Sequence, residues 1–297
     1  FLKTRTGAGF GASAFGGVPA EATVTGTPTG DSIYGGRLFF ARPGFAELGV
    51  SYLQENGTFQ GGDRKEIGGD LWVRPFGAVE LIGNATYNDA TRALAFQRYR
   101  IRLMPFGSVD LSVGYEAYTY KDYFQRALNP AFLSPAIDNN DRVRTVFAVL
   151  DWEVVKKVTV ILGAKNIRHD LKDPGDAKRG ELGVKYTYND LKDAAGASVA
   201  LVTADRDENA YREYRGYATW SPSRWRFALD ALTQQYKAAI DGMKNAYQVV
   251  GSAGFHPFDI LRLSGDLTYT KSPRFEKDYA GLVRASLLFG PGAGGKK

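Results

Sequence analysis

The stretch "RYRIRL" (residues 98–103) alternates arginine with Tyr, Ile and Leu. Successive side chains of a β-strand point to opposite faces, so one face of this strand would carry three guanidinium groups and the other only apolar groups. The same alternation recurs along most of the chain, for example in residues 77–89, 108–120 and 181–190. A period of two over so many segments predicts an all-β protein.

Turn sequences rich in Pro and Gly divide the chain into sixteen predicted strands. Short turns alternate with connections that are mostly longer and more polar, which predicts an antiparallel up-and-down meander with short turns at one rim and loops at the other. An even number of strands places both termini at the short-turn rim. The predicted strands are residues 3–14, 31–42, 45–56, 63–75, 78–89, 92–105, 108–122, 141–155, 157–170, 176–188, 194–206, 211–222, 224–238, 244–257, 259–271 and 277–290.

The composition excludes several classes of protein. The chain of 297 residues has no Cys and only two His, which excludes disulfide scaffolds, thiolate metal sites and a metal site built from histidines alone. Its net charge of +6 is spread along the chain without a basic tail, so we expect no nucleic-acid partner. No catalytic set, metal site or cofactor site is recognisable, and His169 and His256 are expected to be surface or turn residues. We therefore predict that the protein is not an enzyme.

The aromatic residues distinguish a membrane barrel from a soluble sandwich. The longest largely apolar stretch, residues 158–164, is far too short for a membrane helix, whereas a barrel strand crosses a bilayer with about 9–11 residues. Transmembrane barrels carry two girdles of aromatic residues on their lipid-facing side. The predicted girdle has a tyrosine belt at the long-loop end, and a second belt at the short-turn end; the alternative is the ordinary β-propensity of these residues. The first belt is Tyr52, Tyr87, Tyr115, Tyr186, Tyr188 and Tyr269, and the second is Phe76, Phe106, Trp152, Trp220, Trp225, Phe258 and Phe289.

The charged residues on the opposite face would be prohibitively costly in a packed core. A sixteen-stranded barrel instead leaves an aqueous channel, in which such residues face water. Two alternatives stay open for the arginines: they pair with acidic neighbours across the wall, or they favour the passage of anions. The predicted pore-lining residues are Arg98, Arg100, Arg102, Glu80, Asp110, Glu116, Lys185, Arg262 and Asp266. Further candidates on the same face of other strands are Arg37, Arg74, Arg284, Glu47 and Glu181.

In this architecture the whole chain resembles the bacterial outer-membrane porins. The resemblance implies a 16-stranded transmembrane β-barrel in the outer membrane of a Gram-negative cell, with short turns and termini in the periplasm. It also implies passive passage of small hydrophilic solutes or ions, contact with outer-membrane lipid and lipopolysaccharide, and a homotrimer or a partner protein. Residues 1–297 are expected to form one barrel domain, with residues 290–297 as a flexible tail.

Two departures from the porin pattern keep other functions open. The third loop, residues 89–92, is almost absent, and the chain continues beyond Phe289, where porin-like barrels usually end on an aromatic residue. The alternative is a sheath or exit pore of a larger envelope complex, such as a multihaem cytochrome electron conduit or a polysaccharide secretion machine. A barrel enzyme and a soluble all-β protein such as a propeller are further, weaker alternatives.

Overall fold

The structure, a computed structural model, describes residues 2–3, 8–17, 32–56, 64–89, 91–119, 141–171, 175–258, 261–273 and 275–287. Strands account for nearly all of these residues, and the described part contains one short 3-10 helix, η1 (Asp207–Asn209). No helix in this part is long and apolar enough to cross a membrane. The predicted long loops within residues 14–31 and 122–141 fall mostly outside the described residues, as do Phe289 and the predicted tail.

Sixteen long strands match the sixteen predicted strands one for one. The first of them begins at Gly9, later than predicted, because residues 2–3 form a separate short strand, β1 (Leu2–Lys3), that pairs with it. The long strands are β2 (Gly9–Gly17), β3 (Ser32–Arg42), β4 (Ala46–Asn56), β5 (Arg64–Phe76), β6 (Val79–Asn88), β7 (Ala93–Phe106), β8 (Val109–Thr119), β9 (Arg142–Val155), β10 (Val158–His169), β11 (Ala177–Tyr188), β12 (Asp193–Ala204), β13 (Tyr211–Trp220), β14 (Trp225–Ile240), β15 (Met243–Phe258), β16 (Leu261–Ser272) and β17 (Phe275–Leu287).

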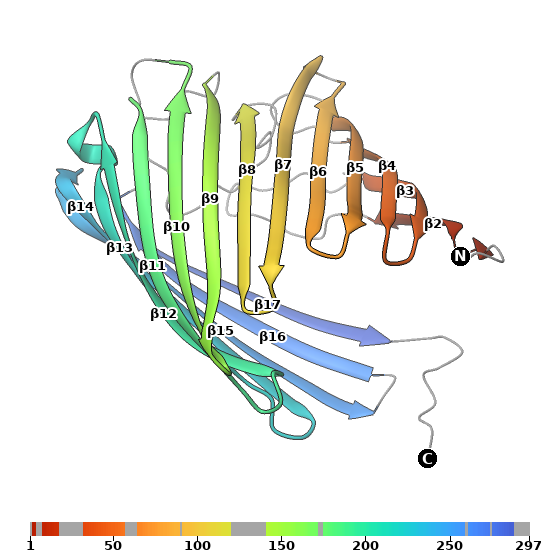
Figure 1. The fold of residues 1–297 in the computed structure, drawn as a ribbon. Helices are drawn as coiled ribbons and strands as arrows, with labels where there is room; N and C mark the ends of the chain where they lie inside the picture. Colours follow the sequence, from red (N-terminus) through yellow and green to blue (C-terminus); the bar gives the residue numbers. More distant parts are fainter. Residues whose placement is uncertain are drawn as a thin grey trace. The chain divides into compact units, whose positions relative to one another are not determined.

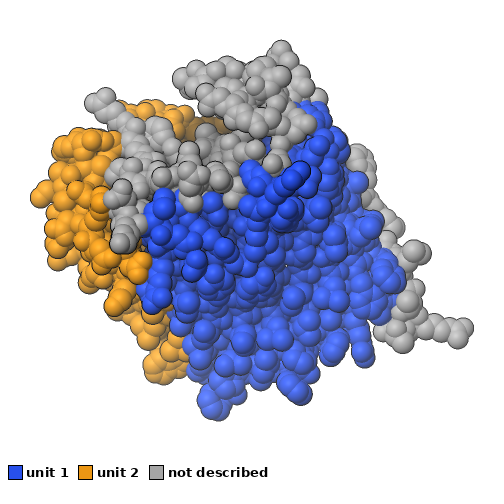
Figure 2. All heavy atoms as spheres, turned by 90° about the horizontal axis from the view of Figure 1, so that it is seen from above, with its two compact units in different colours: residues 1–128, 137–149, 165–173 blue, residues 129–136, 150–164, 174–297 orange. Residues whose placement is uncertain are grey.

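Each long strand is hydrogen-bonded to the strand that follows it in sequence, in an antiparallel meander (Figure 1). The chain divides into two compact units (Figure 2): residues 1–128, 137–149 and 165–173 form unit 1, and residues 129–136, 150–164 and 174–297 form unit 2. Unit 1 contains β2–β8 and unit 2 contains β11–β17, while β9 and β10 contribute to both.

The connections confirm the predicted alternation with one correction. The third loop is as short as predicted, since β6 ends at Asn88 and β7 begins at Ala93. The predicted loop at residues 238–244 is instead a two-residue turn, Asp241–Gly242, between two strands of 16 residues each. Both turn residues have positive φ (47° and 79°), as in the type I′ turns that match the twist of a hairpin. The Asp-Gly pair thus lets β14 and β15 extend into the predicted loop.

The strands form a single layer with two chemically different faces. The apolar face carries large hydrophobic side chains that no described residue covers: Leu38 is 69% exposed, Leu267 63% and Val283 87%. Buried hydrophobic residues are few, and the one cluster seen among the described residues (Tyr236, Ile240, Ala246) is small. An apolar surface of this extent would drive association in water. We call the opposite side of each strand, which carries the arginines, the polar face.

Candidate pore-lining surface

The stretch "RYRIRL" lies in β7, and its side chains alternate between the two faces as predicted. Tyr99, Ile101 and Leu103 lie on the apolar face and are all exposed, between 37% and 48%. On the polar face, cross-strand register decides what each arginine meets, because directly opposed residues share a face. Arg102 lies opposite Glu80 on β6 and Ser112 on β8. The three arginines therefore have different surroundings, although the sequence pattern treats them as equivalent.

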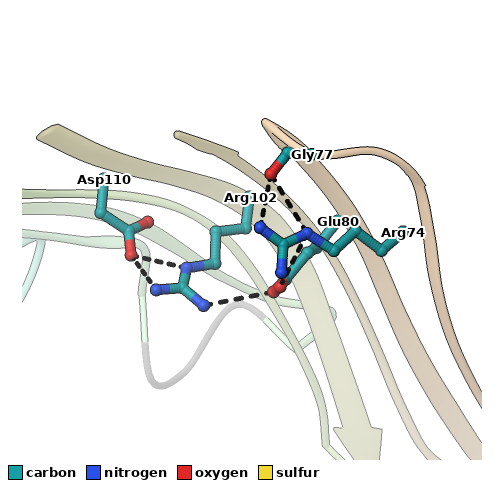
Figure 3. Close-up of polar contacts among 5 residues, drawn as sticks. All are labelled: Arg74, Gly77, Glu80, Arg102 and Asp110. Atoms are coloured by element: carbon teal, nitrogen blue, oxygen red, sulfur yellow. Dashed lines mark hydrogen bonds and ion pairs between the residues drawn. The ribbon is translucent and has the colours of Figure 1, made fainter. Parts of the chain in front are cut away.

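Arg102 lies between two carboxylates from neighbouring strands (Figure 3). Its Nε donates to Asp110 Oδ2 at 2.5 Å and its Nη1 donates to Glu80 Oε2 at 3.2 Å. Glu80 is only 7% exposed, and Arg74 Nε lies 3.9 Å from its other oxygen while also donating to the Gly77 carbonyl at 3.1 Å. Charge-assisted hydrogen bonds on both sides hold the Arg102 guanidinium in one place and neutralise it.

The same arrangement occurs twice more. In unit 1, Arg37 Nη2 donates to Glu47 Oε1 at 2.7 Å and its Nε donates to Asp70 Oδ1 at 3.0 Å. In unit 2, Arg179 Nη2 donates to both Glu181 (3.0 Å) and Glu213 (2.7 Å). Each guanidinium bridges two carboxylates, so its positive charge is neutralised and each of these two clusters keeps one net negative charge.

Other arginines of the polar face form simple pairs. Arg98 Nε lies 3.5 Å from Glu116 Oε2, Arg284 Nη2 lies 2.5 Å from Asp266 Oδ2, and Arg215 donates to Asp230 at 3.0 Å. For the predicted pore-lining residues Arg100, Lys185 and Arg262, no ion pair with a described residue is seen. Pairing across the wall thus accounts for most of the predicted charged set, and the pore-lining role of these residues stays a prediction.

Glycines on the polar face hold aromatic rings flat against the sheet beneath an arginine. The Phe39 ring lies where a side chain on Gly11 would be, the Phe147 ring lies over Gly114, and the Tyr217 ring lies over Gly196. An arginine stacks on each ring, with guanidinium carbons 4.8, 5.3 and 5.8 Å from the ring centroids for Arg37, Arg98 and Arg215 in turn. The stack of glycine, ring and guanidinium keeps the wall thin and restricts the charged group.

We expect Gly114→Ala to destabilise the protein. A Cβ at Gly114 would lie 2.4 Å from the Phe147 ring and 2.5 Å from the Tyr99 carbonyl oxygen, and a backbone atom cannot move away cheaply. The expected loss is about 1–3 kcal/mol in the free energy of unfolding, measured by guanidinium titration in detergent micelles. The matched control is Gly69→Ala on β5, where a Cβ would have no neighbour within 4 Å. Equal midpoints for the two variants would contradict the prediction.

Five members of these clusters are not among the residues predicted from the sequence: Asp70, Arg179, Glu213, Arg215 and Asp230. Each lies on the polar side of a strand that the alternation had already identified. The sequence pattern therefore indicates on which face each of these residues lies. It does not indicate the register between strands, which brings each acid next to its arginine.

The predicted girdle residues lie at the strand ends, with one correction. Tyr52, Tyr87, Tyr115 and Tyr269 lie toward the long-loop ends of their strands, as predicted. Tyr186 and Tyr188 lie at the short-turn end, because β11 runs from the loop side toward the turn at residues 189–192. The short-turn ends also carry Phe76, Phe106, Trp152, Trp220, Trp225 and Phe258.

His169 is more enclosed than a surface histidine. Its side chain is 13% exposed, and its Nδ1 lies 2.5 Å from Oδ2 of Asp141, which is fully buried. The other oxygen of Asp141 accepts the backbone N–H of Leu171 at 3.1 Å. The pair joins the start of β9 to the end of β10. Among the described residues, no three His, Asp or Glu side chains are grouped as a metal site requires.

Comparison with known proteins identifies a structural relationship without a sequence relationship. No protein-family model matches the chain, and no curated protein matches it in sequence. A solved structure of a bacterial polysaccharide outer membrane secretin matches 95% of this chain and 98% of its own, with a TM-score of 0.56 and 9% identity. The fold is that of an antiparallel up-and-down β-barrel of sixteen strands.

A variant of the Rhodopseudomonas blastica porin also matches 95% of this chain and 99% of its own, with a TM-score of 0.48 and 14% identity. The conclusion on the fold rests on the secretin. At 9% identity this likeness extends to the fold alone, so the function has to be argued from the polar face.

Proposed function

We propose that the protein is an outer-membrane channel through which small hydrophilic solutes or ions diffuse passively. The observation that carries this proposal is the chemistry of the single-layered wall. One face is charged and ion-paired, whereas the other exposes large apolar side chains such as Leu38 and Val283. Lipid covers the apolar face without cost, and water solvates the polar face, so both faces are satisfied only around an aqueous lumen.

The ion-paired clusters support weak rather than strong charge selectivity. Arg102 and Arg74 together balance Glu80 and Asp110, so this cluster presents little net charge to a passing ion, whereas the cluster of Arg37 keeps one negative charge. Arg100 differs because its cross-strand neighbours, Ile82 and Gly114, carry no charge. We therefore assign the selectivity of this segment of the wall to Arg100.

The proposal predicts stepwise conductance when the purified protein is added to a planar lipid bilayer. Each step reports the insertion of one water-filled lumen, because ions cross the hydrocarbon core of a bilayer only where an aqueous path keeps them hydrated. Heat-denatured protein from the same preparation is the control. A correctly folded protein that inserts into vesicles but conducts no ions would overturn the channel.

A second candidate is an exit pore for a polysaccharide. The solved structure with the same fold is described as a bacterial polysaccharide outer membrane secretin. Clusters such as Arg37 with Glu47 and Asp70 offer hydrogen-bond donors and acceptors to hydroxyl groups and carry a net charge of only −1. In the same bilayer experiment, an oligosaccharide should reduce the conductance in a concentration-dependent way if the lumen binds glycans. Unchanged conductance favours the simple diffusion channel.

The location of the protein in the cell and its assembly with other chains are further predictions. We place the barrel in the outer membrane with its short turns in the periplasm and its longer loops outside. A homotrimer and a partner protein, including a multihaem cytochrome, both stay predictions. Cross-linking of the native complex, followed by haem staining, distinguishes them.

A further inference from the structure

One of the four tryptophans lies on the polar face, away from the aromatic girdle. The other three belong to the predicted girdle: Trp152, Trp220 and Trp225. Trp72 on β5 shares its face with Asp70 and Arg74, because residues two apart on a strand point to the same side. Its side chain is half-buried, so part of the indole stays open. The proposed channel would therefore expose an aromatic ring to water, which the diffusion of ions does not require.

Cross-strand register places an apolar neighbour beside Trp72. Trp72 lies opposite Glu47 on β4 and Ile82 on β6. Ile82 in turn lies opposite Arg100 on β7. We call Trp72 and Ile82 together the platform. It is an apolar strip two side chains wide, with a charged residue, Glu47 or Arg100, at either end.

The platform differs from the other rings described on the polar face. Arginine guanidiniums stack on the three rings that lie over glycines, so the outer faces of those rings are occupied. For Trp72, neither a stacked guanidinium nor an aromatic partner is seen among the described residues. Its indole N–H likewise has no acceptor in the described part of the chain. A ligand can therefore use both the ring and the N–H of Trp72.

Hydrogen-bonding groups lie next to the platform. The Arg37 guanidinium lies across Gly49, where a Cβ would come within 2.6 Å of its Nε and Nη2. It joins Glu47 and Asp70, whose side chains are still 41% and 33% exposed and keep lone pairs for further donors. Asn84 lies opposite Asp70 on β6, is exposed, and offers an amide that both donates and accepts. The hydroxyl groups of a ligand on the platform would thus find partners on the residues beside the ring.

The charges around the platform balance. Arg100 has no ion pair with a described residue, and its positive charge offsets the net negative charge of the Arg37 cluster. The cluster of Arg102 (Figure 3) and the pair of Arg98 with Glu116 are each neutral. The surroundings therefore favour a ligand that has hydroxyl groups and an apolar face but no net charge.

We propose that the platform binds one neutral sugar ring of a glycan, with the C–H face of the pyranose on the indole and its hydroxyl groups at Glu47, Asp70 and Asn84. The C–H groups carry a partial positive charge and meet the negative face of the aromatic ring, while the hydroxyl groups donate to ionised carboxylates. This inference rests on the proposed function, which it deepens by naming the substrate class and the part of the wall that holds it. An inorganic ion would use the charged groups but not the indole.

The test measures the binding of maltohexaose, a neutral glucose hexamer, to the full chain in detergent micelles by saturation-transfer NMR. Trp72→Ala should raise the concentration for half-occupancy at least about tenfold, which corresponds to about 1.4 kcal/mol, the scale of one aromatic contact. Trp72→Phe keeps an aromatic ring and should raise it by less than about threefold. Asn84→Ala removes one amide and should raise it about threefold, since one hydrogen bond is lost.

Two controls accompany these variants. Trp152→Ala, which removes a ring that is 48% exposed on the apolar face, should bind maltohexaose as the native chain does. An anionic hexamer, hexagalacturonate, should bind no more tightly than the neutral one, because the charges around the platform balance.

The proposal is overturned if the native chain does not bind maltohexaose, if Trp72→Ala binds it as the native chain does, or if Trp152→Ala loses as much affinity as Trp72→Ala. Tighter binding of the anionic hexamer also overturns it. Conductance of the same preparation in a planar bilayer separates this inference from the proposed function. Conductance without Trp72-dependent binding rejects the platform alone, whereas Trp72-dependent binding by a chain that conducts no ions rejects the channel alone.

Discussion

Replacing Arg102 with glutamine is expected to lower the free energy of unfolding by about 2 kcal/mol or more. The change leaves Glu80 and Asp110 without their shared cation, and the Glu80 side chain is only 9% exposed. A carboxylate so enclosed cannot recover its hydration by a small movement, and Arg74, at 3.9 Å, is too distant to replace Arg102. Guanidinium titration of the refolded protein in detergent micelles measures the loss.

The control for this prediction removes the acid together with the base. Arg102→Gln combined with Glu80→Gln should recover part of the lost stability, because no buried carboxylate is then left unpaired. If the single variant is as stable as the native chain, or if the double variant is less stable than the single one, the cluster does not stabilise the wall as the geometry indicates.

Replacing Arg100 with glutamine is expected to shift the channel toward cations with little effect on stability. Arg100 has no ion pair with a described residue, and it lies opposite uncharged residues. A single charge about 7 Å from a passing ion in water contributes about 0.6 kcal/mol, with opposite sign for an anion and a cation, so the ratio of anion to cation permeability should fall by up to about sevenfold at low salt. The reversal potential across a bilayer separating two KCl concentrations measures this ratio.

Salt concentration and a distant lysine provide the controls for Arg100. The shift should shrink at high salt, where the Debye length becomes shorter than the distance between the charge and the ion. Lys237→Gln, which breaks an exposed pair with Asp207, should leave the reversal potential unchanged. An unchanged ratio in the Arg100 variant would mean that paired charges elsewhere set the selectivity.

The strand pattern was predictable because polar and apolar residues alternate within each strand, and this alternation assigns every side chain to one of the two faces. Alternation along β7 separates Tyr99, Ile101 and Leu103 from the arginines without any information about the neighbouring strands. The same local rule located all sixteen strands and the short connection between β6 and β7. Alternation does not define the rim, and Tyr186 and Tyr188 lie at the short-turn rim, not the predicted loop rim, because β11 runs from the loop side toward the turn.

Turn chemistry accounts for the other difference. The polar composition of residues 238–244 suggested a loop, yet Asp241 and Gly242 adopt positive φ and close a tight hairpin. Pairing of Gln235 with Asn245, and of Ile240 with Met243, shows that the strands continue to the turn with one register shift. The local hairpin signal of Asp-Gly thus outweighs the polar composition of the surrounding residues.

The sequence by itself determined that this chain is a layer of β-strands with one charged and one apolar face, because side-chain alternation is a property of each strand alone. Only the tertiary structure decided that Arg102 lies between Glu80 and Asp110, that Arg37 lies between Glu47 and Asp70, and that Arg100 has no such partners. The physical reason is register. Which residues face each other is set by hydrogen bonds between strands, and a slip of one position would move every side chain to the other face.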